Sequence, residues 1–273
     1  MIKKLYIFVG ILISLLLITS CSKQTQINKS YIEKNYYVSK VIDGDTIKVY
    51  YDGDETSVRL IGIDTPETHS GDKPIGELGD TAYWFVRNKI YSENSKKSYV
   101  YLDFDTDKYG YYGRLLAYVY YKGKDGKIHF LNEEIIQNGY ARPLFYSDTS
   151  KRKETFIEAY VYAYENRKGI FQFYDDDNRK IYENDLSDLD IGKIRWVRFK
   201  VKSISRSGSF YHIYSENNKV YITIRSDEYK AFFKNLNIYD LDNKEIEVYG
   251  EVWKDNGIYE ILARAEFEFR IIK

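Results

Sequence analysis

The sequence predicts an α+β fold that is mainly β-strand with helices, organised as two small barrels in one chain of 273 residues. Apolar residues make up 44% of the chain, which is enough to form packed cores. Short segments rich in β-branched and aromatic residues alternate with turn signals along most of the sequence. An acidic, polar stretch from Asp175 to Asp190 divides these segments into two groups, which indicates two domains.

The first group of segments predicts a small closed barrel with three helices packed on it. A bend at Gly44 and a hairpin signal at 52–54 separate its first three strands. An apolar repeat near 78–90 predicts a helix, and two more strands, a short helix capped by Asn132 that stops at Gly139, and a longer helix follow. The predicted strands are YYVSKVID, DTIKVYY, TSVRLIGID, KSYVYLDFD and GRLLAYVYYK.

The second group predicts another barrel of the OB type. Three strands, a helix near Ser226 and two or three further strands occur in the order expected of an OB-fold. The predicted strands are KIRWVRFKVKSI, SFYHIYS, KVYITIR, NKEIEVYGEVW, IYEILA and AEFEFRII. The acidic stretch has Lys180 and Ile181 where an EF-hand calcium loop requires its glycine and neighbours. We therefore interpret residues 173–190 as a linker and 191–273 as an OB-like domain.

The N-terminus predicts export. Residues 1–20 contain two lysines and an apolar run that ends in Ile-Thr-Ser-Cys, the pattern of a signal peptide. The 16 residues from Leu5 to Ser20 are fewer than the roughly 20 that a spanning helix needs, so a short membrane anchor is the weaker alternative. Ile-Thr-Ser-Cys resembles the lipobox of bacterial lipoproteins, which implies a lipid on Cys21 and anchorage in the cell envelope. Residues 21–35 are polar and aperiodic, which indicates a tether.

The overall charge excludes a globally basic nucleic-acid-binding protein. Lysine plus arginine and aspartate plus glutamate both total 41, so local patches would have to attract nucleic acid. The 30 tyrosines are candidate stacking platforms for bases. A biased genome composition explains them better, because the chain is also rich in Lys, Ile, Asn and Asp and has only 3 prolines. One cysteine and three scattered histidines disfavour a zinc site.

One hairpin brings together the residue types that metal-assisted chemistry requires. Asp45 follows the bend at Gly44, Arg59 lies 14 residues later and Asp64 another five, so both carboxylates fold onto one edge of the sheet. Two aspartates with a backbone carbonyl and waters suit Ca²⁺, which takes oxygen ligands in irregular geometry. The segment Asp-Thr-Pro-Glu, which ends at Glu67, is by itself also compatible with a simple turn. The rest of the chain favours a functional site.

Residues 36–172 resemble the staphylococcal nuclease (thermonuclease) family. The motifs IDGDT, RLIGIDTPE, RLLAY and NEEIIQNGYA occur in the family's order and at compatible spacing. The resemblance implies a staphylococcal-nuclease-type OB barrel and a calcium-dependent phosphodiesterase that cleaves DNA and RNA, leaving 5′-hydroxyl and 3′-phosphate ends. It also implies the roles of the site residues: Asp45, Asp64 and the carbonyl of Thr65 for Ca²⁺, Glu67 as general base, and Arg59 and Arg114 on the phosphate.

A three-residue insertion distinguishes this chain from the family pattern Asp-x-Tyr-Gly-Arg. Here DKYG is followed by Tyr-Tyr-Gly before Arg114. Lys108 and Tyr109 match a lysine and a tyrosine that lie near the substrate phosphate in the family. Tyr146 aligns with the family's substrate-stacking tyrosines, with packing as its alternative role. The resemblance therefore makes Lys108, Tyr109 and Tyr146 the expected substrate-binding residues.

The second domain has a row of basic residues on its first predicted strand. Alternation puts Val197 and Phe199 on one face and Trp196 with three cations on the other, and that second face could follow a phosphate backbone. A solvated outer face is the favoured interpretation, since half-buried strands alternate in this way whatever their function. The cations of this strand and its turn are Lys193, Arg195, Arg198, Lys200, Lys202 and Arg206.

The sequence therefore predicts a monomeric, lipid-anchored nuclease that acts on DNA and RNA. The alternative is a non-catalytic nucleic-acid-binding lipoprotein on a nuclease scaffold. A degenerate binder is expected to have lost part of the constellation, whereas Asp45, Arg59, Asp64, Glu67 and Arg114 are all present. We therefore favour the enzyme.

Overall fold

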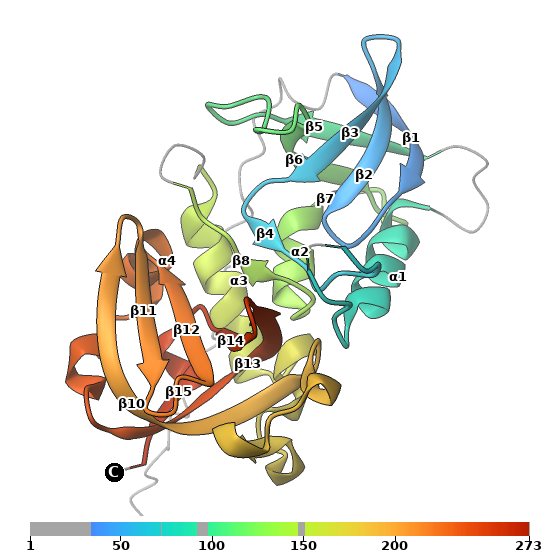
Figure 1. Ribbon diagram of the computed structural model, residues 1–273. Coiled ribbons are helices and arrows are strands. Elements are labelled where there is room, and N and C mark those ends of the chain that lie inside the picture. Colours follow the sequence, from blue (N-terminus) through green and yellow to red (C-terminus); the bar gives the residue numbers. More distant parts are fainter. Residues whose placement is uncertain (1–33, 72, 92–97, 147–150, 273) are drawn as a thin grey trace, which may run out of the picture.

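Two β-barrels with helices packed between them make up the described part of the chain (Figure 1). The computed structural model describes residues 34–71, 73–91, 98–146 and 151–272. The predicted signal peptide, the predicted lipidation site Cys21 and all but the end of the predicted tether lie outside the described residues. Within the described ranges, no helix has the length and apolar character needed to cross a membrane.

The first barrel is a closed sheet. Its strands are β1 Asn35–Val41, β2 Thr46–Tyr51, β3 Asp54–Leu60, β5 Tyr99–Asp103 and β6 Leu115–Lys122, and β7 Ile128–Phe130 extends it from β6. The antiparallel neighbours run β3-β2-β1-β5-β6, and a parallel pairing between β3 and β6 closes the ring. Inward-facing residues such as Val38, Ile47 and Val58 are fully buried, as the alternation of each strand predicts.

Three helices pack against this barrel, as the sequence predicts. They are α1 Gly79–Ile90, α2 Leu131–Gln137 and α3 Lys153–Glu165. Ala82, Val86 and Ile90 of α1 are buried at the predicted spacing of about four residues. A short two-stranded sheet, β4 Ile63–Asp64 with β8 Arg142–Pro143, continues from the barrel toward the second domain.

Asn132 does not cap α2, so this sequence expectation was wrong. The helix begins at Leu131 after Phe130, which places Asn132 inside the first turn. Its buried side chain accepts a hydrogen bond from Val119 N at 2.9 Å and donates one to the Ile61 carbonyl at 2.8 Å. An amide can do both at once. Asn132 therefore ties α2 to the barrel through long-range contacts.

The second barrel repeats the topology of the first. It contains β10 Ile194–Ser207, β11 Phe210–Ser215, β12 Val220–Arg225, α4 Ser226–Phe232, β13 Glu245–Asp255, β14 Ile258–Leu262 and β15 Phe269–Ile271. The order β10-β11-β12-β14-β13 closes when β13 pairs with β10. In both barrels the first strand pairs with the second and fourth, and the third pairs with the fifth. This confirms the predicted mainly β fold with two OB-type barrels.

The segment predicted as a linker is folded onto the second sheet. Within 173–190, β9 Lys180–Tyr182 pairs in parallel with β10 and lies at the edge of the sheet. Trp196 of β10 donates its indole N–H to the Tyr174 carbonyl at 2.7 Å. The polar composition of this segment therefore reflects a solvated edge strand. An extended connection would not make these contacts.

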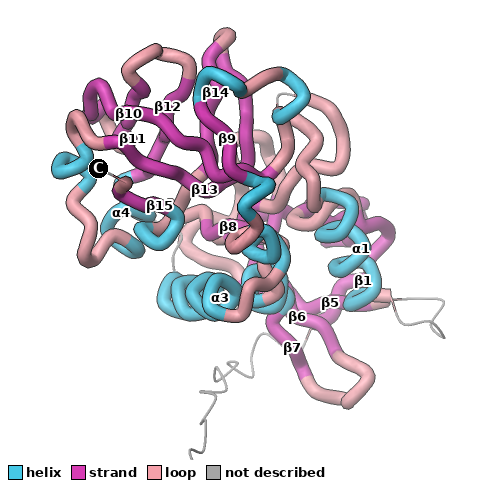
Figure 2. Tube along the Cα trace, turned by 90° about the horizontal axis from the view of Figure 1, so that it is seen from below, coloured by secondary structure: helices cyan, strands magenta, loops and turns pink. Residues whose placement is uncertain are grey.

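Apolar residues of the second domain pack into the core of the first. The apolar cluster of the first domain includes Ile194, Trp196 and Tyr249 from the second. Trp196 lies on the strand face that the sequence predicts to be solvated, yet it is fully buried because this end of β10 packs against the first domain. In Figure 2, β8 lies between the strands of the two barrels. The second domain is thus packed directly behind the edge that carries Asp64.

Candidate active site

Asp45, Arg59 and Asp64 meet at one end of the first barrel. Asp45 precedes β2, Arg59 lies near the end of β3 and Asp64 ends β4, so one hairpin and its continuation position all three. Arg59 Nη1 lies 2.6 Å from Asp45 Oδ2, and Arg59 Nη2 lies 3.5 Å from Asp64 Oδ1. Both carboxylates are buried, and buried carboxylates require a paired charge. The guanidinium therefore bridges two predicted metal ligands.

The Asp45 carboxylate also fixes the Asp-Thr-Pro-Glu segment. Its Oδ2 accepts hydrogen bonds from the Thr65 backbone N at 3.0 Å and from the Thr65 hydroxyl at 3.1 Å. Its Oδ1 accepts a hydrogen bond from the Thr46 hydroxyl at 3.1 Å. Gly44 permits this close approach, because a Cβ there would lie 2.8 Å from both Thr65 and Ala82. A free surface turn would not need such buried contacts.

Lys73 joins the site, although the sequence analysis did not single it out. Its ammonium lies 3.0 Å from Asp64 Oδ1 and 3.1 Å from Glu67 Oε1. Burial alone would lower the pKa of Lys73, but the Asp64 and Glu67 carboxylates raise it above its ordinary value. Burial alone would raise the pKa of Asp64, but Lys73 and Arg59 lower it. Lys73 thus stays charged between a predicted metal ligand and the predicted base.

Asp43 is a second residue of the site that was not predicted from the sequence. It is the first aspartate of the IDGDT motif, it lines the same cleft as Asp45, and its Oδ1 accepts a hydrogen bond from the Asp45 backbone N at 3.0 Å. Burial and the neighbouring Asp45 charge raise the pKa of Asp43 to about 7. A cation entering the cleft would relieve this repulsion. The motif itself was the signal that could have identified Asp43.

These side chains line a cleft of about 680 Å³. Arg114, Tyr109 and Tyr146 line it as well, so the structure brings them to the same space as Arg59 and Glu67. Lys108 lies apart from the cleft. Its ammonium lies 4.8 Å from the ring centroid of Tyr51 and 5.2 Å from that of Phe104.

The three-residue insertion forms part of the cleft rim. Tyr111 and Tyr112 line the cleft and are 97% and 80% exposed. Gly113 has φ +72°, a conformation that favours glycine. The Arg114 guanidinium lies 5.9 Å from the Tyr112 ring centroid. The insertion therefore adds two exposed rings beside a predicted phosphate-binding arginine.

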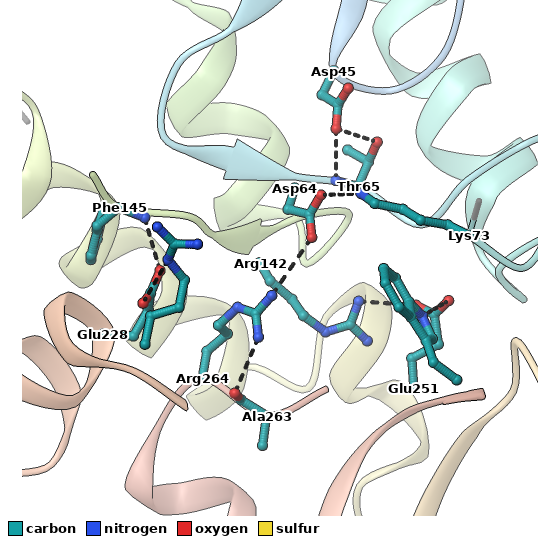
Figure 3. Close-up of polar contacts among 12 residues, drawn as sticks. Asp45, Asp64, Thr65, Lys73, Arg142, Phe145, Glu228, Glu251, Ala263 and Arg264 are labelled. Atoms are coloured by element: carbon teal, nitrogen blue, oxygen red, sulfur yellow. Dashed lines mark hydrogen bonds and ion pairs between the residues drawn. The ribbon is translucent and has the colours of Figure 1, made fainter. Parts of the chain in front are cut away.

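The second domain contacts the site from behind (Figure 3). Arg264 Nη2 lies 3.7 Å from Asp64 Oδ2. Arg142 lies opposite Asp64 in the backbone pairing of β8 with β4, and its side chain forms an ion pair of 3.0 Å with Glu251. The Trp253 ring centroid lies 5.4 Å from the Lys73 ammonium. No local pattern in the sequence predicts these contacts, because they depend on how the two barrels dock.

The basic row on β10 is largely paired with acids or amides. Arg195 lies 3.1 Å from Asp190. The other partners are Glu245 for Arg198 at 2.9 Å, Glu216 for Lys200 at 2.8 Å and the Asn218 side-chain oxygen for Lys202 at 3.0 Å. Each acid cancels much of the attraction that its cation would exert on a phosphate. The structure therefore does not support a phosphate-binding face on this strand.

The donor atoms of the site are all oxygens, as hard cations prefer. Among the described residues, no three His, Cys, Asp or Glu side chains are arranged to hold a metal ion together. The predicted set has only two carboxylates, from Asp45 and Asp64, and its third protein ligand is a backbone carbonyl. The chemistry of this set fits Ca²⁺, and the Lys73 ammonium neutralises one of the same carboxylates.

Comparison with known proteins identifies relatives of the first barrel. Residues 57–172 match the family described as staphylococcal nuclease homologue. A thermonuclease of Staphylococcus hyicus is 35% identical over 139 residues, which cover 51% of this chain and 76% of the relative. An uncharacterized protein of Methanocaldococcus jannaschii is 34% identical, with 51% of this chain and 73% of the relative covered. Endonuclease YncB of Bacillus subtilis is 37% identical over 124 residues, which cover 45% of this chain and 54% of the relative.

Proposed function

The chain belongs to the staphylococcal nuclease family and is a nuclease, and we propose that its cleft carries out calcium-dependent hydrolysis of DNA and RNA to 5′-hydroxyl and 3′-phosphate ends. The observation that carries the proposal is the Arg59 guanidinium, which lies 2.6 Å from Asp45 and 3.5 Å from Asp64 in a cleft that also contains Glu67 and Arg114. A phosphodiester in this cleft meets two cations and a carboxylate within one space.

The two arginines bind the phosphate. Burial alone would lower the pKa of Arg59, but Asp45 and Asp64 raise it, so the guanidinium stays charged. Its two ion pairs fix its orientation before substrate arrives. Attack on phosphorus builds negative charge on the nonbridging oxygens, and guanidinium groups of Arg59 and Arg114 stabilise that charge with directed hydrogen bonds.

Glu67 accepts a proton from the attacking water. The water oxygen forms a bond to phosphorus, the bond from phosphorus to the 5′-oxygen breaks, and the 5′-oxygen leaves with the electron pair and takes up a proton. The 3′-side retains the phosphate. The Glu67 side chain is 30% exposed and lines the cleft, so water reaches it, and the Lys73 ammonium lies 3.1 Å from its Oε1.

Asp45, Asp64 and the Thr65 carbonyl are the residues that would hold Ca²⁺. When bound, the ion supplies positive charge that polarises the phosphate. Contacts among the residues already hold these ligand groups near one another, because Thr65 is hydrogen-bonded to Asp45 and Arg59 contacts both carboxylates. Thr65 is also buried.

Digestion of single-stranded DNA and RNA with Ca²⁺ and with a chelator tests this proposal. Glu67→Gln should retain the fold and slow cleavage roughly 10²- to 10⁴-fold, the range for a lost general base. Glu154→Gln, at an exposed position of α3 that does not line the cleft, serves as a matched surface control. Activity that is unchanged in the chelator, or products with 5′-phosphate ends, would contradict the reaction proposed.

We also propose that the protein is exported, lipid-anchored through Cys21 and monomeric. The support is the apolar run and Ile-Thr-Ser-Cys sequence within residues 1–21. Cys21→Ser should abolish incorporation of a labelled fatty acid and leave the longer precursor. Normal lipid labelling of this variant would refute the assignment, and sedimentation of the protein without its signal peptide measures the oligomeric state.

A further inference from the structure

We propose that the outer face of β11 and β12 is a track for single-stranded nucleic acid that leads away from the cleft. The proposal rests on the nuclease function above and extends it to nucleotides beyond the scissile phosphate. It concerns the second barrel, which lies outside the matched family region of residues 57–172. It also replaces the basic row of β10, whose cations are largely paired with acids or amides, as the substrate-contacting part of this domain.

Three cross-strand pairs form the track. Phe210 lies opposite Arg225, His212 opposite Thr223, and Tyr214 opposite Tyr221. The residues that alternate with them, such as Ile213, Ile222 and Ile224, are fully buried in the barrel. The pairs therefore lie on the face that points away from the core.

The rings of β11 follow one another at regular intervals. The ring centroids of Phe210 and His212 are 6.4 Å apart, and those of His212 and Tyr214 are 6.0 Å apart. Every base has a π-face, so a row of aromatic rings binds successive bases with little sequence preference. In OB-folds the second and third strands are the usual surface for oligonucleotides. Here these strands are β11 and β12.

Arg225 joins this row to the cleft. Tyr146, which is 48% exposed and lines the cleft, has its ring centroid 4.5 Å from the Arg225 guanidinium. The same guanidinium lies 5.3 Å from the Phe210 ring centroid. Buried Glu228 contacts both sides of this junction between Arg225 and Tyr146. It lies 3.6 Å from Arg225, and it accepts a hydrogen bond of 2.9 Å from the backbone N of Phe145, next to Tyr146.

In Figure 1, the turn between β10 and β11 lies on the same side of the second barrel as the segment that follows β8. In Figure 3, Glu228 contacts the Phe145 backbone at the side of Asp64, which places the junction beside the site. A single strand of nucleic acid that leaves the cleft past Tyr146 therefore contacts Arg225 first and the aromatic row next.

The two ends of the track differ in charge. Arg225 is at the end near the cleft, opposite Phe210. At the other end the Tyr221 hydroxyl donates a hydrogen bond to Asp255 at 3.3 Å. Burial and the negative charge of Glu260 raise the pKa of Tyr221. Phosphates are attracted at the first end and repelled at the second. The track therefore accommodates roughly four nucleotides, the lower end of the OB-fold range.

The same charges favour nucleic acid over an oligosaccharide, the other common OB-fold ligand. A neutral sugar gains nothing from the Arg225 charge, whereas a phosphate backbone does. The continuity with a cleft that binds phosphodiesters supports the same choice.

The test compares Phe210→Ala/Tyr214→Ala with the control Tyr182→Ala. Tyr182 belongs to the same domain and is 54% exposed, but it lies on β9. Binding of a labelled single strand of about 20 nucleotides, a length that exceeds the track, is measured by fluorescence anisotropy in a chelator, where no cleavage occurs. Cleavage of a dinucleotide, which is too short to reach β11, is measured separately with Ca²⁺.

The double variant should bind the oligonucleotide at least 10-fold more weakly, as expected for two lost stacking contacts. Its kcat/KM on the dinucleotide should equal that of the wild-type protein, and Tyr182→Ala should match the wild type in both assays. Unchanged oligonucleotide affinity of the double variant would overturn the proposal. The proposal would also be overturned if the double variant lost binding only to a neutral oligosaccharide. If the wild-type protein fails to cleave the dinucleotide, the proposed chemistry is wrong, and the anisotropy result still decides the track.

Discussion

Glu251→Ala should destabilise the whole protein, because it leaves the Arg142 guanidinium charged and buried between the domains. The two side chains are 2% and 1% exposed, and Arg142 Nη1 lies 3.0 Å from Glu251 Oε2. Removing one partner of a buried ion pair costs about 3–5 kcal/mol. For a protein of this size, 1 kcal/mol corresponds to roughly 2–4 °C in melting temperature, so the expected decrease is roughly 6–20 °C.

Thermal unfolding followed by circular dichroism measures this effect, with urea denaturation as an independent value. Glu216→Ala is the matched control, since its pair with Lys200 is about half exposed and should contribute at most about 1 kcal/mol. The double variant Arg142→Met/Glu251→Leu should regain most of the lost stability, because an apolar pair leaves no buried charge. A decrease in Glu251→Ala no larger than that of the control would refute the reasoning. A separate early transition in the wild type would show that the domains unfold independently.

Three further changes probe the site and its surroundings. Lys73→Met should lower the Ca²⁺ concentration for half-maximal cleavage by roughly 5-fold, because the ammonium neutralises Asp64 with an interaction energy of about 1 kcal/mol. An unchanged or higher Ca²⁺ requirement argues against competition between Lys73 and Ca²⁺ for Asp64. Arg264→Met should also lower that requirement, since it removes a cation 3.7 Å from Asp64, while the surface control Arg198→Met should not; equal behaviour of the two would remove Arg264 from the site. Hydrogen bonding to Asp125 raises the pKa of His129, so its pair stabilises the protein fully below about pH 6.5 and loses this effect as pH rises through the folded pKa. His129→Gln should therefore lower the melting temperature at about pH 6 and leave it nearly unchanged at about pH 9, and a pH-independent difference would contradict the assignment.

The local chemistry of the chain was sufficient to predict the elements of the fold. Alternating β-branched and aromatic residues, the hairpin signal at 52–54 and the repeat that contains Ala82 and Val86 identify strands and a helix that the structure confirms. These patterns depend on neighbours a few residues apart, so they are visible without a structure. The same holds for the gathering of Asp45, Arg59 and Asp64, because one hairpin connects them.

Local patterns failed where a long-range partner decides the role of a side chain. Asn132 resembles a helix cap, but its amide bonds to Ile61 and Val119 across the barrel. Trp196 alternates with buried residues as a solvated side chain would, but the other domain covers it. The cations of β10 resemble a phosphate-binding row, but acids such as Glu245 lie opposite them.

Local sequence patterns are sufficient to predict the two barrels, the family of the first and the residues that its motifs name. The pairing of charges and the surface that continues the cleft depend on contacts between distant segments. Lys73 reaches Asp64 and Glu67, Arg264 approaches Asp64 from the second domain, and Arg225 joins Tyr146 to the rings of β11. Electrostatic and stacking energies depend on distances between atoms, and contacts between segments far apart in the chain set these distances.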